Sequence, residues 1–524
     1  MKNFASKSFV LRLFVLNFLF LTAVAFPVAA QSPLSNDFDQ MVLKGMQDWN
    51  IPGMAVAIVK DGKIFYSKGF GEKKLGEGEP VDERTLFGIA SVSKNITAAA
   101  LAMLVDEGKI TWDTKIVDVI PWFALSDPWV TSQVTVRDAL THRVGIGRMI
   151  GNRLQYLSGR DRDELIRHLR YMDFEQPFRT SFVYSNMMYS VAGQVIEYAS
   201  GKTWDDFLVE RIFAPVGMQS NTSVTAITDE SNAAWPHQEI EGQVVPIARR
   251  NWDNAGPAGG INASVTDVAK WMILQLGEPG VYEGKRLISS RQMAEIHRPQ
   301  VVRPSGNVYG SQNSYGLGWN ILDYQGKRVL THGGATDGFN TAAYLMPELN
   351  LGIVVVGNAF NQLGDAIAYT VMDAFLGVSD TDWAKRYLDG YKRSYESATR
   401  QREAIHAARI RDTKTSLALD QYVGKYYSPA YETVEVSQKA DGNLEIKLWD
   451  NEEVVADLEH WHYDTFRAVW RNRAQREEFL YFNLDKSGQV QTLNFEFALR
   501  PVLLQIGTYP SNYTRTVQFE RVRN

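Results

Sequence analysis

The sequence predicts an α+β protein: one antiparallel sheet flanked by helices and interrupted by a helical insertion, followed by a smaller domain of strands alone. Two observations carry this prediction. Strand-like runs occur at both ends of the region from Ser32 to about Phe375, with a long helical stretch between them. Beyond Leu419 the sequence changes to short alternating strands separated by turns. Strands at both ends of one helical block indicate an antiparallel α+β sheet rather than a doubly wound α/β sheet.

The first two strands give the clearest local signal. Two runs rich in β-branched and aromatic residues, Met54–Val59 and Ile64–Phe70, flank the dipeptide Asp61-Gly62. That dipeptide is a strong hairpin signal, because both positions tolerate the positive φ angles of a two-residue turn. Strands return after the helical middle at Arg328–Thr331, Thr341–Met346 and Leu351–Val356. We expect all five runs to belong to the same antiparallel sheet.

Four segments are expected along the chain: a signal peptide (1–30), the main α+β domain (31–380), a helical linker (381–415) and a C-terminal domain (416–524). The linker carries Tyr387, Tyr391 and Tyr395 at four-residue spacing, a stripe that can pack on a neighbouring domain. Between Lys385 and Lys414, nine basic and four acidic residues give a local charge of +5. This charge indicates either contact with an anionic surface or, as we favour, a solvated helix face.

The C-terminal domain is expected to be an all-β barrel or sandwich. Its turns are marked by Asp441-Gly442-Asn443 and by the segment 485–488. Short alternating strands are predicted at Thr433–Val436, Leu444–Lys447, Phe479–Asn483, Gln491–Phe497 and Arg515–Arg521. Many short strands at even spacing are typical of a barrel-like domain.

Residues 1–30 are typical of a secretory signal peptide. Lys2, Lys7 and Arg12 give a basic start, an apolar stretch follows, and small residues precede a cleavage site before Gln31. Cleavage removes three cations and no acid, which changes the formal net charge from −5 to −8. The alternative is an uncleaved membrane anchor, which the short, interrupted apolar run disfavours. We expect an exported protein, periplasmic or extracellular in a bacterium, with no integral membrane segment after cleavage.

The composition excludes several classes of protein. The 524 residues include no cysteine, so disulfides, thiolate metal sites and a cysteine nucleophile are excluded. The mild negative charge gives no basic footprint for nucleic acid. The sequence contains no Gly-x-Ser-x-Gly elbow, no His-Glu-x-x-His pair and no phosphate-binding loop. His460 and His462 flank Trp461 without an evident third ligand, so an aromatic strand surface is the better interpretation, and we expect neither metal nor cofactor.

The first candidate for chemistry is Ser91-Val92-Ser93-Lys94, which opens a predicted helix with one apolar face. Residues three apart share a helix face, so the amine of Lys94 is expected beside the hydroxyl of Ser91. Such a hydroxyl becomes a good nucleophile only when a base takes its proton. A buried lysine can be that base if its pKa falls from about 10.4 towards about 7–8. Ser-x-x-Lys alone is weak, because roughly one chance match is expected in a chain of this length.

Two further motifs follow in order along the chain. Tyr184-Ser185-Asn186 opens an apolar helix that stops at Gly201. Tyr184 is a candidate proton shuttle and Asn186 a candidate substrate or lysine contact. The alternative is an ordinary helix cap after a core tyrosine. The third motif, at 331–335, ends a predicted strand.

The third motif reads Thr331-His332-Gly333-Gly334-Ala335. Two glycines let a ligand approach the backbone closely, and the N–H of Ala335 is a candidate contact for a reacting carbonyl. The alternative is a tight turn that carries a surface histidine.

Together, the order Ser-x-x-Lys, Tyr-x-Asn and His-Gly-Gly resembles the serine β-lactamase and penicillin-binding-protein superfamily. The nearest resemblance is to its class C branch, with the related esterases, D-aminopeptidases and D,D-carboxypeptidases. Supporting segments across residues 40–375 include 87–90, 135–142, 215–218, 259–260 with 266–267, and 315–319. The C-terminal part, from the segment 422–427 onward, resembles the lipocalin-like barrel often fused to such hydrolases.

The resemblance implies a role for each motif residue. Ser91 would form the acyl-enzyme, Lys94 would activate it, and Tyr184 would relay protons to the leaving group and from water. Asn186 would contact the substrate, and the N–H groups of Ser91 and Ala335 would form the oxyanion hole beside His332, Gly333 and Gly334. One departure is His332, because the third motif of β-lactamases usually begins with lysine, whereas imidazole is mostly neutral near pH 7.

The sequence therefore predicts an exported serine hydrolase that acts through acyl-Ser91. The neutral residue at 332 favours an ester, an amide or a D-amino-acid peptide over a β-lactam. The expected partner is a small acyl or peptide substrate, possibly derived from the cell wall; the oligomeric state is left open. The alternative is a cell-envelope binding or sensory module that has the same fold but little or no catalytic activity.

Overall fold

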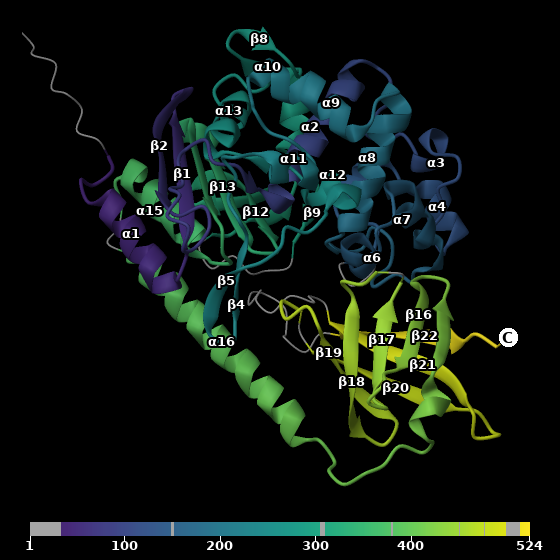
Figure 1. The fold of residues 1–524 in the computed structure, drawn as a ribbon. Helices are drawn as coiled ribbons and strands as arrows, with labels where there is room; N and C mark the ends of the chain where they lie inside the picture. The colour runs from purple at the N-terminus through teal and green to yellow at the C-terminus, as the bar shows by residue number, and fades with distance from the viewer. Residues whose placement is uncertain are drawn as a thin grey trace, which may run out of the picture.

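The computed structural model describes residues 33–147, 151–303, 310–378, 381–449, 451–475, 477–498 and 514–523. The predicted signal peptide, residues 1–30, lies outside the described residues. Figure 1 shows an α+β domain, a long helix that leaves it, and a β-barrel at the C-terminal end. The predicted fold class, an antiparallel sheet flanked by helices and followed by a smaller all-β domain, is confirmed.

The main sheet has eight strands in the order β2-β1-β14-β13-β12-β11-β10-β9, and every neighbouring pair is antiparallel. Strands from the start and the end of the domain meet where β1 pairs with β14, so the sheet closes around the helical insertion. The strands are β1 (Gly53–Lys60), β2 (Lys63–Gly71), β9 (Val301–Val302), β10 (Asn313–Tyr315), β11 (Asn320–Tyr324), β12 (Lys327–Thr336), β13 (Phe339–Met346) and β14 (Leu351–Gly357). Three two-stranded pairs lie outside it: β3 (Phe87–Gly88) with β6 (Asn262–Ala263), β4 (His237–Ile240) with β5 (Gln243–Pro246), and β7 (Val281–Tyr282) with β8 (Lys285–Arg286).

The hairpin at the start of the sheet forms as predicted. Asp61 and Gly62 have φ angles of 52° and 74°, and they connect β1 directly to β2. Left-handed backbone at both turn residues matches the right-handed twist of the strands. The local sequence therefore determines this part of the sheet.

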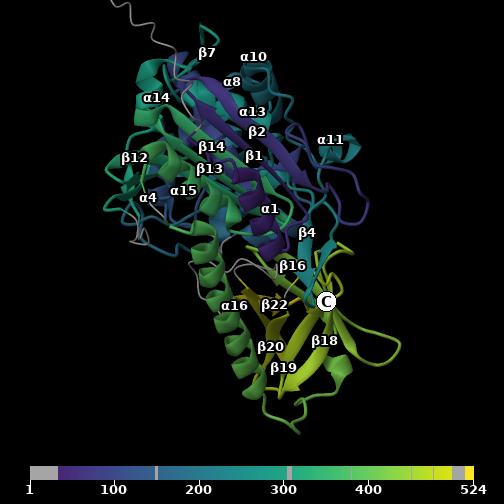
Figure 2. The ribbon, with the colours of Figure 1, turned by 90° about the vertical axis from the view of Figure 1, so that its left-hand side faces the viewer.

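Helices cover both faces of the sheet (Figures 1 and 2). On one face, α1 and α15 enclose a separate apolar core with β1, β13 and β14. On the other face, α13 packs on β1 and β14, and α2 and α8 pack together within the helical layer. The helices are α1 (Phe38–Trp49), α2 (Ser93–Asp106), α3 (Ile116–Val119), α4 (Pro128–Gln133), α5 (Val136–Leu140), α6 (Asn152–Leu157), α7 (Arg162–His168), α8 (Asn186–Ser200), α9 (Trp204–Leu208), α10 (Ala214–Val216), α11 (Val224–Asp229), α12 (Gly256–Gly259), α13 (Val265–Gln275), α14 (Ser290–Ile296), α15 (Leu363–Leu376) and α16 (Trp383–Ala407).

Helix α2 corrects one sequence expectation. The pattern predicted a single apolar face, but every residue from Ser93 to Leu104 is buried. The helix runs through the middle of the helical layer, with α8, α12 and α14 packed around it. A helix surrounded by other helices is apolar on all sides, and its many alanines let those neighbours approach closely. The start of α2, which carries Lys94, is thus fixed within the buried helical layer.

Helix α16 is the predicted linker helix, and its tyrosine stripe packs on the α+β domain. The ring of Tyr387 stacks on Tyr369 at 6.3 Å, and that of Tyr391 lies 4.9 Å from Trp49. The hydroxyl of Tyr395 lies 3.4 Å from a carboxylate oxygen of Glu239.

At its other end α16 meets the barrel. Arg402 and His406 both bind Glu477, at 2.8 and 2.7 Å. Arg402 and His406 of the linker are therefore paired within the protein.

The C-terminal domain is a closed barrel of eight antiparallel strands. Alternate residues point inward, as in the pattern of buried and partly exposed positions along Leu444–Leu448. The strands are β15 (Gly424–Ser428), β16 (Glu432–Gln438), β17 (Leu444–Leu448), β18 (Val455–His462), β19 (Thr465–Trp470), β20 (Glu478–Leu484), β21 (Val490–Ala498) and β22 (Thr514–Arg521). Within the described parts of the chain, no helix combines the length and the apolarity that crossing a membrane requires.

Candidate active site

Ser91 lies on a strained turn directly before α2. The 3₁₀ turn η1 (Ala90–Val92) leads into the helix, and Ala90 has a φ of 48°. Left-handed backbone at a non-glycine residue is costly and persists only where neighbours enforce it. Here Ser93 does so: its hydroxyl donates to the carbonyl of Ala90 at 2.7 Å and accepts from the N–H of Ile261 at 3.1 Å. The turn leaves the Ser91 side chain partly exposed in a cleft.

Lys94 lies one helical turn after Ser91 and is fully buried. Its Nζ lies 3.0 Å from Oγ of Ser91, 2.9 Å from Oδ1 of Asn186 and 2.5 Å from the carbonyl oxygen of Ala258. The predicted pairing of the amine and the hydroxyl is therefore present. The carbonyl of Ala258 is a partner that sequence reasoning missed, because any residue can supply a backbone carbonyl.

The partners of Lys94 suit a neutral amine. The oxygens of Asn186 and Ala258 are acceptors only, so they take two N–H bonds of the amine. In the neutral form, the lone pair is then left facing the hydroxyl of Ser91. The geometry is that of a base ready to receive the proton of Ser91.

Tyr184 brings a phenol to the same hydroxyl. Its Oη donates to Oγ of Ser91 at 2.8 Å, and its ring lies 4.8 Å from Nζ of Lys94. Ser185 caps α8 by accepting from the N–H of Met188 at 3.3 Å. The amine of Lys94 and the phenol of Tyr184, which is 93 positions after Ser91, thus converge on the same oxygen of Ser91.

His142 packs against the motif that contains Tyr184 and Ser185. It is buried with a φ of 58°, accepts from the N–H of Ser185 through Nδ1 at 3.0 Å, and places its ring 4.3 Å from that of Tyr184. Sequence reasoning did not reveal this contact of His142 with the motif. No local pattern indicates it, because the two residues are 43 positions apart.

Strand β12 carries the third motif, and here the sequence expectation was wrong in one respect. The motif was expected to end the strand, but β12 continues through it to Thr336. The strand continues because Asp337-Gly338 forms a two-residue turn and Thr336 pairs with Phe339. Among the described residues, strand β11 pairs with β12 as far as Thr331, so β12 has a free backbone edge on that side from Gly333 to Thr336.

The free edge presents the N–H of Ala335. In an antiparallel pair, hydrogen-bonded and non-hydrogen-bonded positions alternate. Counting from the Thr336–Phe339 pair that closes the turn, Ala335 is a non-hydrogen-bonded position, so its N–H points away from β13. Ala335 and Ser91 line the same cleft. This is the arrangement that the expected oxyanion hole requires.

The two glycines of the motif differ in their surroundings. A Cβ on Gly334 would lie 2.2 Å from the carbonyl oxygen of Ile89, directly before the turn that carries Ser91. A Cβ on Gly333 would meet nothing closer than the carbonyl oxygen of Thr341, at 3.8 Å. Gly334 is therefore required for β12 to lie against the Ser91 turn, whereas Gly333 is open to the cleft.

His332 does not offer a fixed cation to the cleft. The residue is 3% exposed, its Nδ1 lies 2.8 Å from the carbonyl oxygen of Gly333, and its Nε2 lies 3.1 Å from the hydroxyl of Tyr315. A carbonyl accepts only, so Nδ1 carries the proton, and the hydroxyl of Tyr315 can donate to Nε2. Both ring nitrogens of His332 therefore have partners inside the protein.

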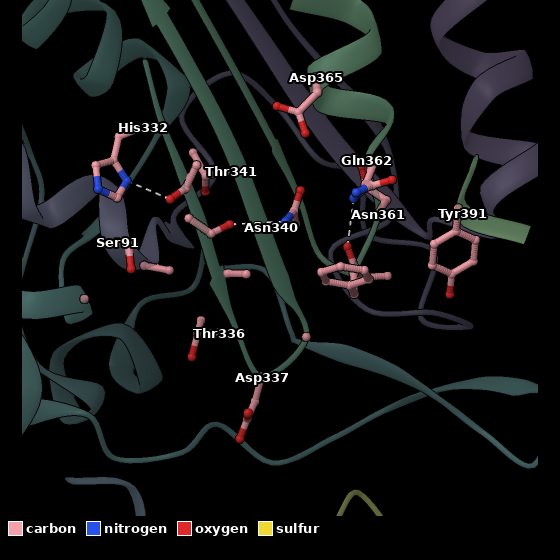
Figure 3. Close-up of a pocket in the computed structure, with 18 of the residues that line it drawn as sticks. Ser91, His332, Thr336, Asp337, Asn340, Thr341, Asn361, Gln362, Asp365 and Tyr391 are labelled. Atoms are coloured by element: carbon pink, nitrogen blue, oxygen red, sulfur yellow. Dashed lines mark hydrogen bonds between the residues drawn. The ribbon is translucent and has the colours of Figure 1, made fainter. Parts of the chain in front are cut away.

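The cleft is long, with a volume of about 660 Å³. Figure 3 shows Ser91 and His332 at one end and Tyr391 of α16 at the other. Trp49 and Phe360 flank Tyr391, with ring centroids at 4.9 and 6.4 Å. Volumes of this size hold ligands much larger than a simple ester.

A buried carboxylate, Asp337, and a partly buried one, Asp365, also line the cleft. Burial raises the pKa of Asp365, which accepts a hydrogen bond from the hydroxyl of Tyr344 at 2.7 Å. Burial likewise raises the pKa of Asp337, while Arg250, whose Nε lies 2.6 Å away, acts in the opposite direction. Both groups therefore have protein partners and shape the wall of the cleft.

Among the described residues, no group of three histidine, cysteine or acidic side chains is placed to hold a metal ion. His460 and His462, the pair considered above, have other contacts. Nε2 of His460 lies 2.8 Å from the carbonyl of Tyr463, and Nδ1 of His462 accepts from the N–H of Ile410 at 3.4 Å.

The eight-stranded sheet, the buried helix behind the cleft and the appended barrel define a penicillin-binding-protein-like hydrolase with two domains. The chain belongs to the beta-lactamase family, whose sequence profile matches residues 38–374. The predicted membership of the serine β-lactamase and penicillin-binding-protein superfamily is thus confirmed. Residues 408–507 match a second family, described as a domain of unknown function (DUF3471).

Known relatives agree with this assignment. "Unguisins hydrolase ungD'" of Aspergillus campestris is 30% identical over 439 residues, which cover 79% of each chain. Penicillin-binding protein 4 of Amycolatopsis lactamdurans is 29% identical over 296 residues, 55% of this chain and 76% of that protein. The octameric penicillin-binding protein homologue from Pyrococcus abyssi aligns with a TM-score of 0.59 at 20% identity, over 88% of this chain and 97% of that one. This last likeness shows a shared fold across both domains.

Proposed function

We propose that the protein is an exported serine hydrolase that forms a covalent acyl ester on Ser91. The observation that carries this proposal is the convergence on one hydroxyl oxygen of Lys94 Nζ at 3.0 Å and Tyr184 Oη at 2.8 Å. A hydroxyl, a buried amine and a phenol in mutual contact are what nucleophilic acyl transfer needs.

In the acylation step, Oγ of Ser91 attacks the carbonyl carbon of the substrate while its proton passes to Nζ of Lys94. The carbonyl oxygen becomes an oxyanion and is stabilised by the N–H groups of Ser91 and Ala335. The bond to the leaving group then breaks, and Tyr184 passes a proton to the departing oxygen or nitrogen. The products of this step are an acyl-Ser91 ester and the protonated leaving group.

Deacylation runs through the same groups in reverse. Water replaces the leaving group, Tyr184 accepts its proton, and the hydroxide attacks the ester carbonyl. The Ser91 oxygen leaves and regains its proton from Lys94. Asn186 has two tasks in this scheme: it holds Nζ of Lys94 at 2.9 Å and lies where a substrate amide would pass.

The substrate we propose is an ester, an amide or a D-amino-acid peptide such as one derived from the cell wall. Neutral His332 provides no counterpart to the lysine that β-lactamases usually carry there, which disfavours strong β-lactam hydrolysis. Arg303 also lines the cleft, with its guanidinium 5.1 Å from the ring of Phe182, and supplies a cation for a carboxylate-bearing peptide. The hydrolase from Aspergillus campestris is named for its action on unguisins.

The distal part of the cleft supports an extended substrate. Trp49, Phe360 and Tyr391 form an aromatic wall that a short ester does not reach. Tyr391→Ala should raise KM for a long acyl or peptide substrate by about 3–10-fold, since an aromatic contact contributes about 0.5–1.5 kcal/mol. KM for p-nitrophenyl acetate should not change. Tyr427→Ala, at an exposed tyrosine of the barrel outside the cleft lining, is the matched control.

The test of the hydrolase proposal is turnover. The mature protein is incubated with a series of p-nitrophenyl esters, D-Ala peptides and a chromogenic cephalosporin. The proposal expects hydrolysis of at least one ester or peptide, loss of that activity in Ser91→Ala, and weak or no cephalosporin turnover. Export is tested separately by N-terminal sequencing of the mature protein, which should begin at Gln31.

A second candidate is a cell-envelope binding or sensory module with little or no turnover. The neutral residue at 332 and the additional barrel favour it. Against it, a binding module has no chemical need for Ser91, Lys94 and Tyr184 in mutual contact. Specific peptide binding without turnover, unchanged in Ser91→Ala, would support this candidate in place of the hydrolase.

A further inference from the structure

We propose that the C-terminal barrel positions a residue of the active site. It binds helix α6 and so keeps Asn152 in hydrogen-bond contact with Asn186. This proposal rests on the hydrolase function proposed above and adds a role for the barrel in it. The grip consists of two contacts on either side of Asn152. The contacts lead from the barrel to α6, from Asn152 of α6 to Asn186, and from Asn186 to the amine of Lys94.

The first contact is a buried ion pair between the domains. Arg153 of α6 is 3% exposed and Glu478 of β20 is 2% exposed, and their side chains form a salt bridge. Trp470 donates from Nε1 to the second oxygen of Glu478 at 3.1 Å. The guanidinium of Arg153 also lies over the rings of Trp470 and Phe497, at 5.4 and 5.2 Å.

Such a pair is costly to bury and costly to break. Two charges removed from water are tolerated only with good geometry and further hydrogen bonds, as Arg153 and Glu478 have here. Removal of one partner leaves a buried charge without compensation. The barrel can therefore leave α6 only at a large energetic cost, and the pair fixes α6 rather than merely touching it.

The second contact lies one residue before Asn152. The backbone N–H of Gly151 faces the hydroxyl of Tyr431, which belongs to the barrel and is 4% exposed. Gly151 has a φ of 78°, and a Cβ there would lie 2.7 Å from Cγ of Met187 on α8. The start of α6 is thus held between the barrel and the helix that carries Asn186.

Asn152 occupies the position between these two contacts and lines the cleft instead of the domain interface. Its Oδ1 accepts from Nδ2 of Asn186 at 3.4 Å. An amide that donates with its nitrogen to Asn152 must present its oxygen on the other side, and Oδ1 of Asn186 indeed accepts from Nζ of Lys94 at 2.9 Å. Asn152 is therefore a positioning residue that sets the orientation of the Asn186 amide, and so keeps an acceptor facing Lys94.

The opposite wall of the cleft is held by the same part of the barrel. Gln238 of β4 lines the cleft and donates from Nε2 to the carbonyl of Ala474 at 2.9 Å. Gln475 lies 3.4 Å from the guanidinium of Arg153. The connection between β19 and β20 thus contacts both Gln238 of the cleft lining and Arg153, the neighbour of Asn152.

The interface also contains a matched pair of contacts away from the cleft. Glu432 of β16 binds Arg160 and lies 2.9 Å from Nε2 of His168. Arg160 and His168 do not line the cleft around Ser91. Loss of Glu432 should weaken the association of the same two domains without displacing Asn152. It therefore distinguishes an effect of weaker domain association from an effect of the position of Asn152.

The test compares Glu478→Gln and Asn152→Ala with the control Glu432→Gln. Both test variants should lower kcat for a short ester by about 10-fold or more, the cost of a misplaced catalytic group, with KM changed less than about twofold. Their kcat–pH profiles should also shift, because the environment of Lys94 changes. Glu432→Gln should match the wild type in kcat, KM and pH profile. The double variant Glu478→Gln/Asn152→Ala should lose no more activity than either single variant, since both act on one connection.

Asn152→Ala leaves the domain interface intact, so it keeps the proposal testable if Glu478→Gln does not fold. Unchanged kcat and pH profile in Asn152→Ala, or additive losses in the double variant, would overturn the proposal. Hydrogen exchange of the α6 amides gives a readout that does not depend on turnover: it should rise in Glu478→Gln and stay unchanged in Glu432→Gln. If wild type shows no turnover but exchange follows this pattern, the hydrolase function fails while the grip on α6 stands; equal exchange in both variants overturns the grip itself.

Discussion

The backbone N–H of Ser185 donates a hydrogen bond to Nδ1 of His142 at 3.0 Å. This contact fixes the start of α8, and the histidine ring lies 4.3 Å from the ring of Tyr184, the residue just before Ser185. The phenol that reaches Ser91 is therefore supported from behind by an imidazole with left-handed backbone, at a φ of 58°. Strain of this kind usually persists where the surrounding structure uses it.

The acceptor on His142 should matter more than its ring. His142→Asn and His142→Gly both accept left-handed backbone, but only asparagine keeps a polar acceptor near the N–H of Ser185. We expect His142→Asn to retain kcat within about tenfold of wild type and His142→Gly to lose about 100-fold, in line with the loss of precise positioning. The measurement is kcat and KM on one ester, with the melting temperature of each variant as the control. Equal kcat values in the two variants would contradict this positioning role.

Lys94 should be essential for turnover but not for folding. Lys94→Met keeps the length of the side chain and removes the base, so kcat/KM should fall by about 10²–10⁴-fold. Because the buried oxygens of Asn186 and Ala258 each lose their N–H donor, the melting temperature should fall by a few degrees while the variant still folds. The value of kcat/KM is measured by ester kinetics, and the melting temperature is measured by thermal unfolding. A variant with more than about a tenth of wild-type kcat/KM would show that another group takes the proton.

The two glycines of the third motif should respond differently to the same substitution. Gly334→Ala places a methyl group 2.2 Å from the carbonyl oxygen of Ile89, so β12 must move away from the Ser91 turn. The expected cost is about 1–3 kcal/mol of stability, together with a loss of activity. Gly333→Ala should unfold at the wild-type midpoint. Urea titrations of both variants check this, and equal midpoints would mean that β12 does not lie as close to the turn as described.

Asp138 should make part of the stability depend on acid pH. Burial raises the pKa of Asp138, but hydrogen bonds from Arg179, the charge of Arg143 and bonds from Thr135 outweigh it, and the net pKa lies below the ordinary 3.8. A lowered pKa in the folded state adds stability above about pH 4, and that stability is lost as the pH falls below this value. Asp138→Asn should cost about 3 kcal/mol at pH 7, the low end for a buried pair, because Arg179 stays partly solvated. In urea titrations, the difference from wild type should shrink below pH 4; a constant difference would assign the effect to packing.

Much of the fold follows from local sequence patterns. The Asp61-Gly62 hairpin, the α8 cap at Ser185 and the left-handed stop at Gly201 need only their immediate neighbours. The spacing of Ser91 and Lys94 also predicts their contact, because residues three apart share a helix face. These features were predictable because the interactions that determine them are local.

The remaining features depend on contacts that the sequence does not encode locally. Two glycines weaken a strand signal, so β12 was expected to end before Gly333, yet Gly334 is needed for close approach to Ile89. The partners of Lys94 include a carbonyl at Ala258, which could belong to any residue. Arg153 and Glu478 are 325 positions apart, so only the docking of the barrel reveals their pairing.

Covalent labelling of Ser91 tests the central claim most directly. The mature wild-type protein and Ser91→Ala are treated with a fluorophosphonate probe, digested and mapped by mass spectrometry. The account predicts one stoichiometric adduct on the peptide that contains Ser91 in the wild type, and none in Ser91→Ala. An adduct on any other residue, or a folded and active wild-type protein without an adduct, would contradict it.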